Sequence, residues 1–504
     1  MTATLTRPEG VELRPKAGRN HSWHLSIWLG LFGFLAAFAG SWVPSFWGDE
    51  AASVMSAERS LPSLFGMLRN VDVVHGVYYL FLHFWIQAFG ASEILVRLPS
   101  ALAVGIMVAG VFTLGRILAT TNVGIVAAVL SSVLPRTSYM GADARSYALS
   151  TAIAVWVTVL LVVLLRGHFA SRAAHRLAWV GYAVVVAVGV YLFLYLGLLL
   201  LVHGAFLFTS RSYSRNRHAW LKAAGLTLAL SLPILVLGYA QRGQIAFLAH
   251  RGYTTAKSVF VTQWFVNPYL AVTAWVLIAI AITGAVLIWR RTREVSPLVS
   301  LGLLWVFVPS LALLGLNLVT PAYNLRYVSF CIPGVALAIT AGIWMLRKKA
   351  ARIALVVVLL VCAIPTDVVQ RGPFAKDGGS DLAQTAAIIG QDAKPGDGII
   401  FDRTTANRQR PRLAEHLYPG DFTGLQDVAL KTSYVNRSML WDTTYPTVDI
   451  LSLLNDLNRV WVVELTGSPD NVQSTDVHTL ESAGYTLTST QLVHRTIIYL
   501  FVKS

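Results

Sequence analysis

The chain has 504 residues, of which 55% are hydrophobic and only 13% are charged, and its formal net charge is +15. About a quarter of the residues in soluble domains are charged, so this composition excludes a soluble globular protein and indicates a polytopic membrane protein. The positive charge does not indicate a nucleic-acid partner, because Lys and Arg cluster in short loops between apolar runs. Cys331 and Cys362 lie in apolar runs, where they are expected to pack rather than to form a disulfide or bind a metal.

The apolar runs predict eleven transmembrane helices after a polar N-terminal tail. The tail, residues 1–20, is expected to be disordered and cytoplasmic. The first run is expected to be a retained span, because no cleavage site of small residues follows it. A helix needs about 20 apolar residues to cross the hydrocarbon layer. The predicted spans are 24–43, 94–118, 123–140, 147–165, 177–191, 192–209, 220–240, 268–289, 298–319, 327–346 and 352–369.

Basic connectors set the predicted orientation. Those near 166–176, 211–222, 290–293 and 347–352 are cytoplasmic by the positive-inside rule, which leaves the C-terminus outside. This assignment requires that the short apolar segment 75–90 does not cross, so we predict an interfacial or re-entrant helix on the outer face. The outward segments are then 44–93, 136–146, 241–267, 320–327 and everything after 370.

We therefore expect an α-helical transmembrane domain over residues 21–370, with an important first outer loop at 44–93, and a soluble extracytoplasmic α/β domain over 371–504. The second domain is polar and alternates helix and strand patterns. Its aromatic residues Tyr434, Trp441 and Tyr445 are expected either to form its core or to present a ligand. The predicted helices are 380–391, 410–418 and 471–483, and the predicted strands are 398–402, 460–465, 485–493 and 495–503.

Two adjacent carboxylates, Asp49 and Glu50, stand where the first span ends. One interpretation is a functional acid at the membrane boundary. The alternative is that Asp49 caps a short helix that starts near Ala51. A carboxylate costs less at a span end than in mid-bilayer, so its presence alone does not demand a function.

Three arginines stand at outer ends of spans, where neither the helix dipole nor the positive-inside rule favours them. They are Arg97, Arg145 and Arg326. An anionic partner would explain them, because Arg presents a rigid fork of donors to phosphate oxygens. The alternative for Arg145 is an ion pair with Asp143 or a side chain that reaches the interface. His75 is isolated, and the sequence lacks both Asp-x-Asp and the His or Cys spacing of metal sites, so no metal or cofactor is expected.

Together these segments resemble the GT-C class of membrane glycosyltransferases, and within it the dolichyl-phosphate-mannose protein mannosyltransferases and their bacterial relatives. The resemblance is strong over residues 40–150, and the pattern is most similar to actinobacterial members, whose donors are polyprenyl-phosphate mannose or arabinofuranose. The chain has Gly76-Val77 where many relatives have Pro-Pro after the His. The matching segments are Trp47–Ala51, His75–Leu80, Val96–Ala101, Asp143–Leu149 and Arg326–Tyr327.

The resemblance implies transfer of a sugar, with inversion and without a metal, from a polyprenyl monophosphate to an acceptor outside the plasma membrane. Asp49 would be the general base, and Glu50 would assist it or orient the acceptor. Arg145, Arg326 and Arg97 would bind the donor phosphate. The further substrate-binding residues expected are His75, Tyr78, Tyr147, Tyr327 and Asp143.

Mannose is expected ahead of arabinofuranose, and the acceptor is a glycolipid, a cell-wall polysaccharide or a protein. Two alternatives come from other classes. One is a lipid or solute transporter, although its usual half-repeats and mid-membrane charges are not evident in the sequence. The other is a non-catalytic receptor or assembly factor whose outer domain binds a glycan or a partner.

Overall fold

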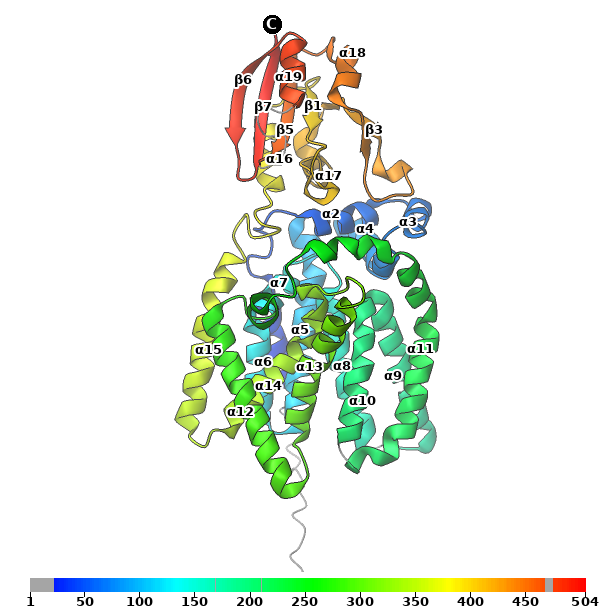
Figure 1. The fold of residues 1–504 in the computed structure, drawn as a ribbon, viewed down its shortest axis with the longest axis vertical. Helices are drawn as coiled ribbons and strands as arrows, with labels where there is room; N and C mark the ends of the chain where they lie inside the picture. The colour runs from blue at the N-terminus through cyan, green and yellow to red at the C-terminus, as the bar shows by residue number, and fades with distance from the viewer. Residues whose placement is uncertain (1–21, 168, 210, 467–474) are drawn as a thin grey trace, which may run out of the picture.

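The computed structural model describes residues 22–504 apart from 168, 210 and 467–474. The expected N-terminal tail therefore lies outside the described residues. The molecule is elongated, with a helical body at one end and a smaller domain that contains a sheet at the other (Figure 1). Helices α2 (Gly48–Glu58), α3 (Leu61–Leu68) and α4 (Gly76–Phe89) lie at the junction of the two.

The helical body has the expected apolar helices. Eight are long and apolar enough to cross a membrane, and the bent pair α6 (Thr121–Val133) and α7 (Pro135–Gly141) makes up to nine. Pro135 explains the 63° bend, since proline lacks the N–H that would continue the helix. The eight are α5 (Glu93–Leu118), α8 (Tyr147–Arg166), α9 (Arg172–Leu192), α11 (Arg217–Ala240), α12 (Pro268–Thr292), α13 (Pro297–Asn317), η6 (Leu325–Cys331) with α14 (Ile332–Met345), and α15 (Lys349–Val369).

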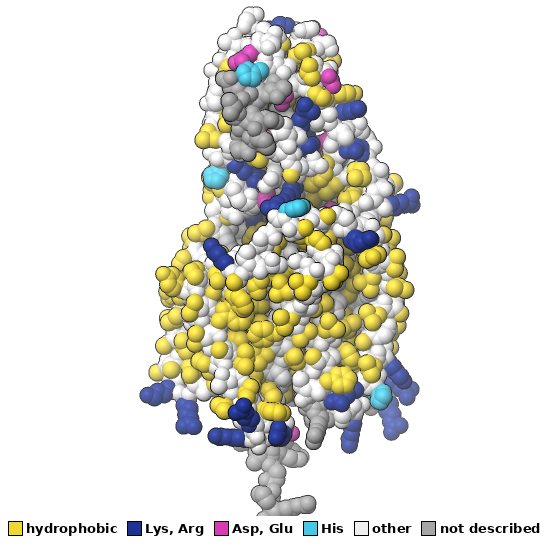
Figure 2. All heavy atoms as spheres, viewed as in Figure 1, with side chains coloured by type: hydrophobic (Ala, Val, Ile, Leu, Met, Phe, Trp, Pro, Cys, Tyr) yellow, Lys and Arg dark blue, Asp and Glu magenta, His cyan; other side chains and the backbone are white. Residues whose placement is uncertain are grey.

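Two shorter apolar helices, α1 (Ser22–Phe38) and α10 (Leu199–Thr209), coincide with the remaining predicted spans. Each of the eleven predicted spans thus has helical structure at its position, while the number of membrane crossings stays a prediction. Figure 2 shows a broad apolar band across the visible face of the body, with Lys and Arg side chains gathered at the end far from the sheet domain. That asymmetry is the one used to predict a cytoplasmic face.

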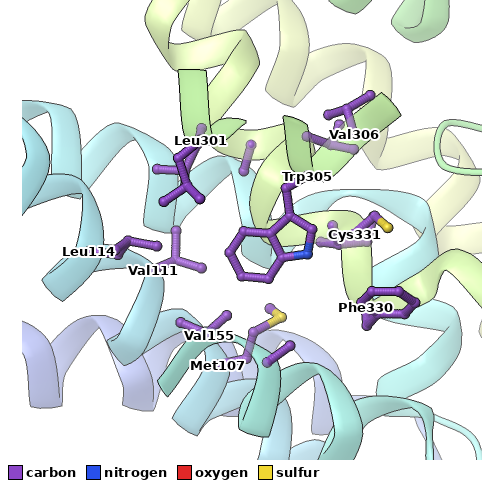
Figure 3. Packing of buried hydrophobic residues seen from close by; sticks show 14 of the residues in the cluster. Met107, Val111, Leu114, Val155, Leu301, Trp305, Val306, Phe330 and Cys331 are labelled. Carbon is purple, nitrogen blue, oxygen red and sulfur yellow. The ribbon is translucent and has the colours of Figure 1, made fainter. Parts of the chain in front are cut away.

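The core of the body is closely packed. Trp305 of α13 is fully buried and lies among Met107, Leu301 and Phe330 (Figure 3). Small residues let helices approach closely: a Cβ atom at Gly302 would lie 3.0 Å from the backbone nitrogen of Ala338 on α14. Such contacts replace the hydrophobic effect as the main source of helix association within lipid.

The junction is built from the segment that follows α1. It contains α2 (Gly48–Glu58), α3 (Leu61–Leu68), the 3-10 turn η1 (Val73–His75) and α4 (Gly76–Phe89). The last two occupy the predicted interfacial segment, and α4 buries Tyr78 and Tyr79 while it exposes Phe84 and Phe89.

Over its described residues, the C-terminal domain has a mixed sheet of five strands in the order β2-β1-β5-β7-β6 and a separate antiparallel pair, β3 (Leu430–Thr432) and β4 (Thr443–Thr444). Strand β1 pairs in parallel with β2 and β5, and β7 is antiparallel to β5 and β6. The start of the helix predicted at 471–483 lies outside the described residues. The main elements are α16 (Leu382–Asp392), β1 (Gly398–Phe401), η7 (Asn407–Gln409), α17 (Leu413–Leu417), β2 (Gln426–Asp427), β5 (Arg459–Leu465), α19 (Thr475–Ser482), β6 (Tyr485–Leu492) and β7 (Thr496–Lys503).

Candidate functional site

The two adjacent carboxylates stand in the first turn of α2. The helix begins at Gly48, with Trp47 at the N-cap position, so Asp49 lies inside the helix. This corrects the alternative in which Asp49 caps a helix that starts near Ala51. Both acids gain from the N-terminal end of the helix dipole. Successive helical residues point about 100° apart, so the two carboxylates face different surroundings.

Asp49 meets an arginine from a segment far along the chain, η6. The Arg326 Nη1 atom lies 2.6 Å from Asp49 Oδ2, and the two side chains keep 16% and 20% of their surface exposed. The Arg326 guanidinium also lies 4.8 Å from the centre of the Trp47 ring. Burial disfavours the charged acid, but Arg326 and Arg145 outweigh it and hold the pKa of Asp49 below its usual range.

Arg145 approaches the same turn from the connection between α7 and α8. Its Nη1 donates to the Asp49 carbonyl and to Ser53 Oγ, both at 3.2 Å. Its Nη2 lies 2.9 Å from His75 Nε2. Burial and the nearby Arg145 lower the pKa of His75 well below its usual value, so the ring is neutral and accepts this hydrogen bond. His75 thereby orients Arg145 rather than adding a charge.

Glu50 points into the protein and forms a closed ion pair with Arg97. Arg97 donates from Nε to Glu50 Oε1 at 2.7 Å and from Nη2 to Oε2 at 2.6 Å, and both side chains are 0% exposed. The remaining Arg97 donors reach backbone carbonyls of residues 41–45. The backbone N–H of Ala144 also donates to Glu50. These contacts correct the expectation that Arg97 binds phosphate and Glu50 orients the acceptor, because the pair instead fixes the loop that presents Asp49.

Asp143 is fully buried beside this loop and does not pair with the Arg145 side chain, which corrects the simple ion-pair alternative. Its Oδ1 accepts a hydrogen bond from Trp47 Nε1 at 3.0 Å and lies 3.8 Å from Lys376 Nζ. Its Oδ2 has no hydrogen-bond partner among the described residues, and the Tyr78 hydroxyl lies close to the Ser100 side chain. Burial raises the pKa of Asp143 and lowers that of Lys376.

Tyr147 and Tyr327 belong to an aromatic wall beside the arginines. The Tyr327 ring stacks on Tyr195 with centroids 4.7 Å apart, and Phe193 lies edge-on to both Tyr147 and Tyr327. Tyr327 follows Arg326 directly, so η6 brings a cation and an aromatic face to one place. This wall is suited to hold an apolar chain or a sugar face next to an anion.

Three residues at the site are absent from the expected set. They are Lys376, Asp72 and Tyr79. Lys376 lies in the linker after α15. The Tyr79 hydroxyl donates a hydrogen bond to Asp72 and also lies 3.5 Å from Arg145 Nη1. Lys376 carried a usable signal, because a lysine shortly after the last span on the predicted outer side opposes the positive-inside rule. Asp72 has a left-handed backbone with φ of 59°, which its sequence does not reveal. Within the described residues, no group of three or more His, Cys, Asp or Glu side chains is placed to hold a metal.

The C-terminal domain lies directly on the helix that carries Asp49. A Cβ atom at Gly48 would overlap the carbonyl oxygen of Arg408, in the segment that contains η7. At the other end of α2, the fully buried Arg59 donates to three carbonyls of the domain, those of Arg437, Met439 and Leu440. The acid therefore lies between the helical body and the outer domain.

Comparison with known proteins identifies the fold that carries this site. A family model described as dolichyl-phosphate-mannose-protein mannosyltransferase matches residues 76–237. No curated protein matches the sequence. A crystal structure of ArnT from Cupriavidus metallidurans bound to undecaprenyl phosphate is similar over 95% of this chain and 98% of that one, with a TM-score of 0.56 and 12% identity. The apo Archaeoglobus fulgidus oligosaccharyltransferase is similar over 96% and 75%, with a TM-score of 0.50 and 10% identity.

These matches confirm the expected fold class and the expected resemblance: the chain has the fold of the GT-C glycosyltransferases, with many apolar helices and a small C-terminal sheet domain. They also support a membrane glycosyltransferase among the classes of protein considered. The actinobacterial origin stays a prediction.

Proposed function

We propose that this chain transfers a sugar from a polyprenyl monophosphate donor to an acceptor hydroxyl on the outer face of the plasma membrane. The observation that carries the proposal is the meeting of Asp49 with Arg145 and Arg326, which come from segments far apart in the sequence. An ionised acid beside two cations, at a membrane boundary, suits a reaction in which a proton is removed and a phosphate leaves.

Asp49 is the general base. It takes the proton of the acceptor hydroxyl while the hydroxyl oxygen attacks the anomeric carbon from the face opposite the phosphate. A new C–O bond to the acceptor forms as the bond from the anomeric carbon to the phosphate oxygen breaks, and the electron pair leaves with the polyprenyl phosphate. The anomeric configuration inverts, and Asp49 then returns its proton to water.

Arg326 and Arg145 stabilise the phosphate as its charge grows. In the donor-free protein Arg326 is bound to Asp49. When a phosphate takes over this guanidinium, Asp49 loses its strongest neighbouring cation and becomes a stronger base. His75 holds Arg145 in place, and Tyr147 and Tyr327 flank the sugar or the first prenyl units. Asp143 and Tyr78, which are buried beside the loop that carries Asp49, complete the proposed substrate-binding set.

The sugar is mannose in the leading form of the proposal, which the description of the matching family model supports. Arabinofuranose is the alternative donor sugar. The acceptor is a glycolipid, a cell-wall polysaccharide or a protein. The N-terminus is cytoplasmic and the C-terminal domain extracytoplasmic, in line with the Lys and Arg side chains gathered at the end of the body far from that domain (Figure 2).

The test uses purified full-length protein with synthetic polyprenyl-phospho-mannose or polyprenyl-phospho-arabinofuranose and a cell-envelope acceptor fraction. Wild-type protein is expected to release polyprenyl phosphate with one of the two donors, and only when acceptor is present. Asp49→Asn is expected to bind donor normally and to release none. Wild-type turnover by Asp49→Asn would remove this residue as the base.

A further inference from the structure

A cleft at the junction of the two domains is lined by residues other than those given roles in the proposed reaction. Its volume is about 570 Å³, within the usual range for small-molecule sites. Three segments line it: the turn after α3, the segment around η7, and the segment 437–444. The lining residues that the argument uses are Arg403, Asn407, Arg410, Arg437, Trp441 and Thr443.

The cleft is held next to Asp49 by one short segment. Asn407 and Arg410 line the cleft, while Arg408 between them lies with its carbonyl against Gly48, the residue before the acid. The opposite wall is fixed by Arg59, which donates to the carbonyls of residues 437–440, and by Ser63, which donates to the Val435 carbonyl at 2.6 Å. A molecule in the cleft is therefore positioned relative to the reacting acid.

The lining of the cleft is basic. It contains three arginines and one carboxylate, Asp442. That carboxylate already accepts hydrogen bonds from His416 Nε2 and from the backbone N–H of Tyr434, both at 2.5 Å. Within the described part of the chain, none of the three arginines forms a salt bridge. Arg410 donates to the backbone carbonyls of Arg403 and Thr405, and its charge interacts with the nearby Asp402 and Asp442. A ligand with carboxylate or phosphate groups would satisfy this excess of positive charge.

The remaining lining residues suit a saccharide. Trp441 offers a partly exposed indole face, of the kind that packs on the apolar face of a sugar ring. Asn407 and Thr443 supply neutral donors and acceptors beside it. An aromatic platform, neutral hydrogen-bonding groups and arginines together match a sugar chain that carries anionic groups better than a purely apolar ligand.

We propose that this cleft binds the acceptor, and that the acceptor is an anionic saccharide, with carboxylate or phosphate groups, whose hydroxyl-bearing end reaches Asp49. The proposal rests on the proposed function and deepens it, since it names the class of acceptor. It also gives Trp441 a role in presenting the acceptor. Tyr434, by contrast, is buried against Arg59, with the guanidinium 5.1 Å from the ring centre, and serves the domain junction.

The experiment measures binding to the full-length protein in detergent by microscale thermophoresis. The probes are tetragalacturonate, its neutral methyl ester, a phosphorylated mannopentaose and a poly-glutamate peptide of similar charge. We expect at least one anionic saccharide to bind about tenfold or more tightly than the neutral ester, with added salt weakening the difference. Whichever of the two anionic saccharides binds identifies the anionic group.

The variant Arg403→Gln/Arg437→Gln is expected to lose that preference. The matched control, Lys394→Gln/Lys503→Gln, removes two exposed charges from the same domain outside the cleft and is expected to keep it. Because Arg437 also holds the Trp441 carbonyl, the single variant Arg403→Glu repeats the test at an exposed position if the double variant melts early.

Three results of the comparison between ligands and variants would overturn the inference. They are equal binding of the neutral ester, equal losses in the control variant, and binding of the acidic peptide as tight as that of the saccharides with the same dependence on Arg403. Polyprenyl phosphate binding is measured on the same samples. A wild-type protein that binds polyprenyl phosphate but no anionic saccharide refutes the cleft alone, whereas one that does not bind the lipid phosphate refutes the proposed function.

Discussion

Replacing the neighbouring acids Asp49 and Glu50 one at a time distinguishes a role in catalysis from a role in the stability of the fold. Asp49→Asn and Glu50→Gln each remove one negative charge with little change in shape. Asp49 faces Arg326 at a surface that keeps contact with water, whereas Glu50 and Arg97 are completely buried. We therefore expect the two substitutions to have opposite signatures.

The magnitudes follow from the two environments. Removing one partner of a buried pair leaves an uncompensated charge and costs about 3–5 kcal/mol. Glu50→Gln is expected to approach that range, because Arg97 places two hydrogen bonds on the carboxylate and has no exposed surface. Asp49→Asn is expected to cost less, about 1–2 kcal/mol, because Asp49 and Arg326 keep 20% and 16% of their side-chain surface exposed and water can partly solvate the arginine that is left. It is also expected to lower kcat by about a hundredfold to ten-thousandfold, as for the loss of a general base.

The assay pairs thermal unfolding in detergent with the release of polyprenyl phosphate under single-turnover conditions. Glu50→Gln should melt several degrees early and keep measurable turnover in the fraction that remains folded. Asp49→Asn should melt near the wild-type temperature and turn over negligibly. If Glu50→Gln proves inactive but as stable as wild type, while Asp49→Asn still turns over, the roles assigned to the two acids are reversed and the reasoning fails.

Four further predictions can be checked with the same protein. Arg326→Gln is expected to lower kcat/KM about a hundredfold and to weaken binding of polyprenyl phosphate, whereas Arg290→Gln at the opposite end of the body leaves both unchanged. The neighbouring arginines lower the pKa of Asp49, so the stability that the ionised Asp49 contributes is present above the unfolded pKa and is lost as the pH falls through the lower folded pKa. The acid limb of the kcat/KM profile should therefore lie below the usual Asp range. The acid limb of the kcat profile should lie at higher pH, because phosphate then engages Arg326. Gly48→Ala is expected to cost about 1–3 kcal/mol and to increase protease cleavage between the domains, because the new methyl group overlaps the Arg408 carbonyl; Gly181→Ala, whose Cβ meets no atom within 4 Å, is the control. EDTA is expected to leave turnover unchanged, and a loss that Mg²⁺ or Mn²⁺ restores would contradict a metal-independent reaction.

The membrane helices follow from the sequence because hydropathy is a local property. Runs of apolar residues and basic connectors were enough to place a helix at each predicted span, and the alternation of patterns after residue 370 predicted the sheet domain. The arginines at 145 and 326 were detectable for a related reason, since charge at an outer helix end opposes both the dipole and the positive-inside rule.

What could not be predicted depends on which way a side chain points. Asp49 and Glu50 are adjacent in sequence, and only the onset of α2 at Gly48 sends one toward Arg326 and the other toward Arg97. Arg97, Arg145 and Arg326 look equivalent in a hydropathy profile, yet Arg97 is fully buried in the protein and unavailable to a ligand. The cleft combines segments hundreds of residues apart, and no local pattern reports such a meeting.

The attachment of the outer domain through Arg59 affects which residues at the domain junction can vary among homologues. The guanidinium donates to main-chain oxygens, so an exposed side chain of this stretch, such as that of Met439, can change without loss of these hydrogen bonds. Exposed side chains in this stretch can therefore be substituted during evolution, for example to bind other acceptors, while Arg59 is retained. Homologues are expected to show a constant arginine at the end of α2 opposite a rapidly drifting segment.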